Sequence, residues 1–197
     1  MDINHSTALG GALAWTSGNI MIANFTFEGK RVQGGDVYFT KTYSTGLNIF
    51  FDPNNTISEW DFEIPQGTYT KINISYKTYG KSGDKSIVLK GIYKNTTNNI
   101  IYPVTFEFEA EEYYTIVAKT SSGSAEIVLS KDVAASALIK ADPVYWFQTV
   151  STSMMDNATL TTVNGNPTIL ISDSNNTNIY DAVRDRMNDD VTTVTFN

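Results

Sequence analysis

The chain has 197 residues, of which 41% are hydrophobic and 12% aromatic, so it can bury a sizeable core and is neither fibrous nor disordered. Its 14 Lys and Arg residues stand against 21 Asp and Glu, and the net charge of -7 argues against a nucleic-acid partner, because phosphate binding needs clustered cations. The absence of Cys excludes disulfides, thiol nucleophiles and Cys-based zinc sites, and the single histidine, His5, lies in a polar end unsuited to a rigid catalytic triad.

The cellular setting is indicated by composition. No run approaches the ~20 apolar residues of a membrane helix, and the first six residues lack the basic and apolar regions of a signal peptide. Two interpretations fit, a cytosolic protein and the mature form of an exported one. The 25 Thr, 18 Asn and 16 Ser residues favour export, because Thr suits exposed strand faces and Asn and Ser suit turns, as in many extracellular β-proteins.

Residues 1–14 are predicted to form a flexible N-terminal segment, and residues 15–197 a single domain. Alternation of apolar and polar residues predicts about nine short strands in the first two thirds, which is typical of a sandwich or barrel. The expected strands are 19–28, 36–43, 47–51, 60–64, a long one after the turn at 65–67, 87–93, 100–109, 113–119 and 125–129.

The same alternation predicts which side chains point inward. In three strands the inner face is expected to carry Met21, Ala23, Phe25 and Phe27, then Ile72, Ile74 and Tyr76, and then Tyr102, Val104, Phe106 and Phe108. With the strands of the last third, the expected fold is a mainly β, antiparallel β-sandwich of about nine to eleven strands.

The last third is predicted to mix short helices with strands as a C-terminal strand–helix–strand appendage. An Ala-rich helix is expected over 132–139 after Ser130, and Asp142 followed by Pro143 starts another. The remaining elements are a hairpin turn at 164–167, a strand at 168–171, a helix at 179–188 capped by Asn178, and a strand at 191–196.

The densest acidic cluster lies around Glu107 and Glu109. These two residues share a strand face about 7 Å apart, a spacing that would suit the paired acids of a glycosidase. They lie opposite the core-facing stripe of the same strand, so a solvated outer face explains them better. We therefore expect no catalytic residue and no enzyme activity.

A calcium loop is the best inorganic candidate, with Asp173, Asn175 and Asp181 as ligands. An EF-hand loop would have Gly at Asn178 and a bidentate Glu at Arg184, and both are missing. A turn followed by a helix cap explains the same residues without metal. The sequence therefore predicts no cofactor, with calcium kept as the alternative.

Aromatic side chains are the other candidates for ligand contacts. Three Trp, eleven Tyr and ten Phe are present, and sugar rings stack on exposed aromatic faces. The candidates near turns or on otherwise polar faces are Trp15, Tyr43, Tyr69 and Tyr113.

The segment 60–72, with its Ile-Pro-Gln-Gly-Thr-Tyr turn, resembles a strand–turn–strand of uncharacterised cell-surface β-sandwich lipoproteins of Bacteroidetes. Further segments carry the same resemblance: 102–107, 142–147, 168–171, 178–181 and Arg186. The resemblance implies export to the extracellular face of the outer membrane, a lipid anchor on an upstream cysteine, and a sandwich similar to transthyretin or carboxypeptidase-regulatory modules. It implies no active site.

Two functions are expected from these features. The first is a non-enzymatic cell-surface module that binds an extracellular polymer such as a glycan. The alternative is a structural adhesin or fimbria-like subunit, in which residues 1–14 are donated to the sheet edge of a neighbour. The expected partners are extracellular polysaccharides or other surface proteins, with the membrane reached only through the lipid anchor.

Overall fold

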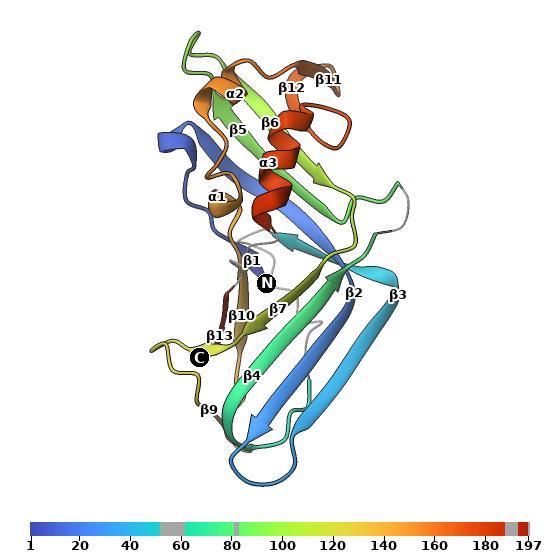
Figure 1. Cartoon of the computed structure of the whole chain (residues 1–197), viewed down its shortest axis with the longest axis vertical. Helices are drawn as coiled ribbons and strands as arrows, with labels where there is room; N and C mark the ends of the chain where they lie inside the picture. The colour runs from blue at the N-terminus through green and yellow to red at the C-terminus, as the bar shows by residue number, and fades with distance from the viewer. Residues whose placement is uncertain (52–61, 81–82, 188–192, 197) are drawn as a thin grey trace.

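The computed structural model of the chain describes residues 1–51, 62–80, 83–187 and 193–196. These residues form an elongated, mainly β structure of two sheets with a few short helices (Figure 1). The expected mainly β class and sandwich arrangement are confirmed. The expected strand at 60–64 lies partly outside the described residues, and 62–66 are irregular.

The larger sheet contains nine strands. They are β2 (Leu13–Arg31), β3 (Val37–Phe51), β4 (Gly67–Thr78), β5 (Ile87–Lys94), β6 (Ile101–Phe108), β7 (Tyr113–Val117), β9 (Ile127–Leu129), β11 (Leu160–Val163) and β12 (Asn166–Ile171). The order is β11–β12–β6–β5–β2–β4–β7, with β3 paired to β2 and β9 paired to β4.

Strand β2 belongs to both ends of this sheet. Its first half, through Ile20, pairs with β5, and its second half, from Ile22, pairs with β4. Strand β3 runs antiparallel to β2 along most of its length, so the two expected strands at 36–43 and 47–51 are one element. Strand β2 runs from the upper to the lower part of the molecule, and β3 lies beside its lower part, as Figure 1 shows.

Two irregularities in β2 change which side chains point inward. The register shifts between Trp15 and Ser17 and again between Ile22 and Asn24. Each extra residue reverses the alternation, because successive strand side chains point to opposite faces. Ile22 is therefore buried, and Met21 and Ala23, expected on the inner face, are only half-buried.

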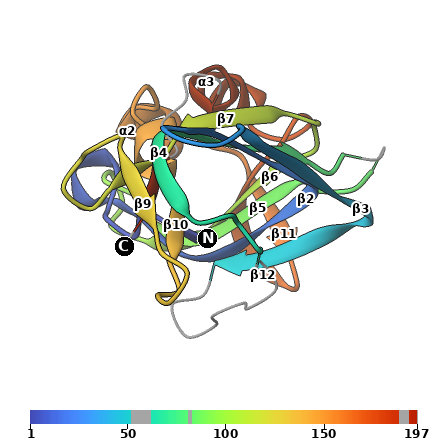
Figure 2. The ribbon, with the colours of Figure 1, turned by 90° about the horizontal axis from the view of Figure 1, so that it is seen from below.

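The smaller sheet contains β1 (Asp2–Ile3), β8 (Lys119–Thr120), β10 (Ala137–Ala141) and β13 (Thr193–Phe196), in the order β1–β10–β13–β8. Three pairings in the two sheets are parallel rather than antiparallel: β1 with β10, β13 with β8, and β12 with β6. Viewed along the long axis in Figure 2, β9 and β10 lie on the side of the molecule away from β3.

The Ala-rich helix expected over 132–139 is wrong. Residues 130–136 are irregular and exposed, and β10 follows them, with Ile139 and Ala141 buried. Strand pairing with β13 and β1 overrides the helix propensity of alanine, which is only a weak local preference.

The helices are η1 (Leu9–Gly11), α1 (Pro143–Trp146), α2 (Thr152–Asp156) and α3 (Thr177–Met187). The predicted cap of α1 is confirmed, because the Asp142 carboxylate accepts a hydrogen bond from the Tyr145 backbone N–H. The hairpin turn between β11 and β12 is also confirmed, with positive φ at Asn164 and Gly165. Helix α3 begins at Thr177, before the expected position.

The C-terminal unit of β12, α3 and β13 is part of the main structure. Strand β12 extends the larger sheet beside β6, and β13 lies inside the smaller sheet between β10 and β8. Buried residues of both sheets and of α1 and α3 belong to one hydrophobic cluster. The described residues therefore share a single core.

Residues 1–14, expected to be flexible, pack onto this core. Ile3 is 0% exposed, and Ala8 and Leu13 are buried as well. The backbone N–H of Asn4 donates to the carbonyl of Ala141, which extends the pairing of β1 with β10. The buried apolar residues of this segment are separated by polar residues and follow no regular spacing. Local periodicity therefore does not reveal from the sequence that the segment is docked.

We predict that Ile3→Ala lowers the free energy of unfolding by about 2–4 kcal/mol, the usual cost of truncating a buried isoleucine. Urea unfolding would measure this loss. Thr7→Ala, at an exposed position of the same segment, serves as the control and should change stability by less than about 0.5 kcal/mol. Equal, small effects of both substitutions would mean that the segment is not docked in solution.

Candidate functional site

Two of the four aromatic residues expected to bind a ligand are buried. Trp15 is 3% exposed and Tyr69 is 0% exposed, so neither offers a ring face to solvent. The Trp15 ring packs edge-on against Phe147 of the segment after α1, with ring centroids 4.9 Å apart. The role of these two side chains is therefore packing rather than the expected stacking on a sugar.

The other two aromatic candidates do not form a shared surface. Tyr43 of β3 packs against the core, and the Lys41 ammonium lies 5.6 Å from its ring centroid. Tyr113 of β7 is 69% exposed, and it precedes the buried Tyr114, so it points away from the core. The Lys77 ammonium lies 5.4 Å from the Tyr113 ring centroid. The four candidates are thus spread over four strands.

A large cavity lies between the two sheets in the half of the molecule that contains β4, β10 and β13. Its volume is about 1220 Å³. The described residues that line it deepest are buried and apolar, and they come from β2, β4, β10 and β13: Phe25, Phe27, Ile74, Ile139, Val194 and Phe196. The space is open to solvent on one side, and a concave site with apolar walls and a few polar groups is a candidate binding site.

The cavity is lined by aromatic rings on one side and partly by small side chains on the other. Phe25 and Phe27 line it from the larger sheet, and Phe62 stacks on Phe25 with ring centroids 4.7 Å apart. On the opposite side Ala135 and Ala137 line it, and their small side chains do not reach across the roughly 10 Å between packed sheets. From the sequence the two Phe residues are expected in the core and the alanines in a helix, so no local pattern reveals this site.

The polar residues that line the cavity lie together. They come from two short segments, Glu63 to Gln66 and Ser130 to Asp132, and all of them are exposed. Gly67 of β4 pairs with Leu129 of β9, so the residues on either side of that pair, Gln66 and Ser130, are neighbours as well. We call these two segments the polar mouth of the cavity.

Tyr69 positions one side of the polar mouth. Its ring packs on Phe27, and its hydroxyl donates a 2.6 Å hydrogen bond to the carbonyl of Pro65. Burial raises the pKa of the Tyr69 hydroxyl, partly opposed by the nearby Arg31 cation. Arg31 in turn donates hydrogen bonds to the backbone carbonyls of Gly35 and Gln66. Tyr69 therefore holds the segment from Glu63 to Gln66 in place through the backbone carbonyl of Pro65.

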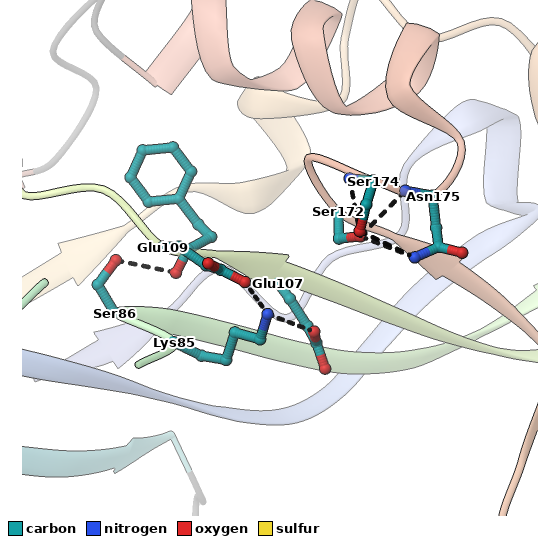
Figure 3. A network of polar contacts seen from close by, with 8 residues as sticks. Lys85, Ser86, Glu107, Glu109, Ser172, Ser174 and Asn175 are labelled. Carbon is teal, nitrogen blue, oxygen red and sulfur yellow. Dashed lines mark hydrogen bonds and ion pairs between the residues drawn. The ribbon is translucent and has the colours of Figure 1, made fainter. Parts of the chain in front are cut away.

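The acidic pair Glu107 and Glu109 is held by one cation (Figure 3). The Lys85 ammonium lies 3.2 Å from a carboxylate oxygen of Glu107 and also contacts Glu109. The three side chains are a quarter to a third exposed; Glu107 lies on β6, Glu109 just after β6, and Lys85 just before β5. These ion pairs connect the neighbouring strands β5 and β6, which gives the acidic cluster a structural role.

The loop expected to bind calcium is organised by its own hydrogen bonds (Figure 3). The Ser172 hydroxyl accepts from the backbone N–H of Ser174 and from the backbone and side-chain N–H groups of Asn175. Asp181 lies on α3 and pairs weakly with Arg184, at 3.8 Å, and Asp173 is exposed. Within the described residues no three His, Cys, Asp or Glu side chains group as metal ligands. Calcium binding at Asp173, Asn175 and Asp181 stays a prediction.

Among the described residues, Asp156 has the carboxylate that accepts the most hydrogen bonds. It accepts from the Tyr93 hydroxyl at 2.8 Å, from the backbone N–H of Thr96 at 2.8 Å, and from the hydroxyls of Thr96 and Thr97. The Thr96 hydrogen bonds hold the pKa of the carboxyl below its usual value, and burial raises the pKa of Tyr93. These contacts tie α2 to the turn between β5 and β6, so we assign Asp156 a structural role.

Comparison with known proteins gives no relative: the chain matches no protein-family model, no curated protein and no solved structure. Among the described residues, none of the helices combines the length and apolar character needed to cross a membrane.

We predict that Asp156→Asn lowers the urea midpoint at pH 7 and that this difference shrinks as the pH falls. Because the folded-state pKa lies below the unfolded value of about 3.9, the carboxylate stabilises the fold fully above that pH and loses its contribution as the pH falls through the folded pKa. Parallel urea titrations of both proteins at pH 7 and pH 3 measure the change. Asp36→Asn, at an exposed position, is the control, and a pH-independent difference would contradict the assignment.

Proposed function

We propose that the protein is a non-catalytic binding module that takes the apolar part of its ligand into the cavity between the sheets. The observation that carries this proposal is the segregated lining, with buried Phe and Ile side chains inside and exposed polar residues at the mouth. Ligand sites are typically concave, mostly apolar and furnished with a few polar groups that fix orientation.

The chemistry of the lining favours binding over catalysis. The ionisable residues among the described lining are Glu63, Lys131 and Asp132, and all three are exposed, where water screens their charges. General acid–base catalysis needs a group whose pKa is tuned by burial or by a close partner. The aromatic rings of the lining offer dispersion contacts and no nucleophile.

The proposal keeps the expected setting at the cell surface, which rests on composition and on the family resemblance. It changes the expected manner of binding. A polymer would be recognised by an apolar substituent that enters the cavity, since Trp15 and Tyr69 are buried and cannot stack on sugar rings.

The test is a fluorescence titration with Nile red, an uncharged dye that emits strongly in apolar surroundings. We expect saturable binding by the unmodified protein and at least tenfold weaker binding by Ala135→Trp, because the indole would occupy the cavity from an exposed, irregular position. The matched control is Ala125→Trp, also exposed and irregular but outside the lining. Equal binding by the two variants would place the dye elsewhere and refute the proposal.

A second candidate function, assembly by strand addition, is favoured by the place of β1. This strand lies at the edge of the smaller sheet, pairs with β10 through two residues, and inserts Ile3 into the core. The exposed residues 5–7 connect it to the rest of the chain. The same pairing would form if β1 of a second copy took this position, because the contacts are identical.

Engineered cysteines test this candidate, since the chain has none of its own. Ile3 and Ala141 are register partners, and paired strands bring their Cα atoms within disulfide reach. If copies exchange β1, an oxidised mixture of Ile3→Cys and Ala141→Cys proteins should form a covalent dimer more efficiently than a mixture of Thr7→Cys and Ala141→Cys. If a disulfide forms only when Ile3→Cys and Ala141→Cys are combined in one chain, and the mixture of single variants gives no dimer, exchange is excluded.

A further inference from the structure

We infer that the ligand of the cavity is an amphiphile with an uncharged, hydrogen-bonding head and an apolar tail. This inference rests on the proposed function and adds the chemical class of the ligand. Three features of the site carry it: an apolar interior, polar residues confined to one mouth, and charges of both signs at that mouth.

The interior selects for a tail that makes no hydrogen bonds. Its walls are the rings of Phe25 and Phe27 on one side and the side chains of Ile139, Val194 and Phe196 on the other. A sugar or peptide group placed between these walls would lose its hydrogen bonds to water without replacement, a large penalty for buried polar groups. An alkyl or polycyclic hydrocarbon gains by the same transfer.

The mouth fixes the position of the head. Because Gln66 and Ser130 are neighbours across the β4–β9 pair, an amide and a hydroxyl are available side by side at this end of the cavity. Both side chains donate and accept hydrogen bonds. Hydroxyl or amide groups of a ligand head can therefore pair with them while the tail lies between the sheets.

The charges at the mouth do not favour a charged head of either sign. The carboxylates of Glu63 and Asp132 and the ammonium of Lys131 line it, and the Arg31 guanidinium contacts the backbone of Gln66. The ammonium of Lys41 lies 5.8 Å from the ring of Phe62, another lining residue. An anionic or cationic head would meet a repelling group as well as an attracting one, and an uncharged head avoids both.

The experiment compares three probes with the same twelve-carbon tail, all below their micelle concentrations: dodecyl glucoside, dodecyltrimethylammonium and dodecyl sulfate. Displacement of Nile red measures each affinity, and glucose oligomers without a tail are included. We expect the uncharged probe to bind about tenfold more tightly than either charged one, and the oligomers not to compete.

Charge variants test whether residues of the polar mouth determine the preference for an uncharged ligand head. Asp132→Lys should raise the affinity for dodecyl sulfate relative to dodecyl glucoside at least threefold, and Asp185→Lys, the same change on exposed α3, should not. A charged probe that binds as tightly as the glucoside would overturn the ligand class. If it did so while Ala135→Trp still abolished binding, the binding module would survive and only its assigned ligand would fail.

Discussion

The continuity of β2 is the constraint on which the rest of the structure depends. One strand of 19 residues pairs with β5 in its first half and with β4 in its second, so it joins two parts of the sheet that otherwise have different neighbours. A strand this long must keep its apolar residues on the core side throughout. The two register shifts do this, because the buried residues are odd-numbered at Trp15, even-numbered at Ile20 and Ile22, and odd-numbered again from Phe25.

The second half of β2 also sets the geometry of the cavity mouth. Gly29 lies where any side chain would collide with the ring of Tyr69, since an added Cβ would be 2.5 Å from it. The missing side chain lets this ring pack edge-on to Phe27 and direct its hydroxyl to Pro65. A glycine in one strand thus helps to hold the irregular segment 62–66, which carries Glu63 and Gln66 to the mouth.

Much of the fold could be predicted where a strand is regular. The inner faces predicted for Ile72, Ile74 and Tyr76 and for Val104, Phe106 and Phe108 are confirmed, because alternation continues without interruption in these strands. Alternation cannot register an inserted residue, so Met21 and Ala23 were placed on the wrong face.

The candidate site escaped prediction for a different reason. Its walls come from β2, β4, β10 and β13, which are far apart in sequence, and no local pattern marks them as neighbours. Its alanines lie in the segment 132–139, which was expected to be a helix on propensity alone. Tyr69 was expected to stack on a ligand because it lies beside a turn, but its ring is buried and its hydroxyl donates to the backbone carbonyl of Pro65.

The two halves of the larger sheet differ in what covers their inner face, and the large cavity lies against the half that contains β4. Over the first half of β2, the inner face is covered by aromatic side chains from α3 and from the residue that follows α1. Phe147 packs on Trp15 and Phe106. Tyr180 of α3 packs on Phe106 and Phe108. Over the second half, no described helix takes this place, and the smaller sheet faces β2 across the cavity, with Ile139, Val194 and Phe196 in its wall and alanines at and just before the start of β10. A helix delivers large side chains into a gap between layers, whereas the alanines around the start of β10 leave part of the gap open. The same long strand is therefore closed into a packed core at one end and left as the wall of a cavity at the other, and the difference comes from what was placed opposite it.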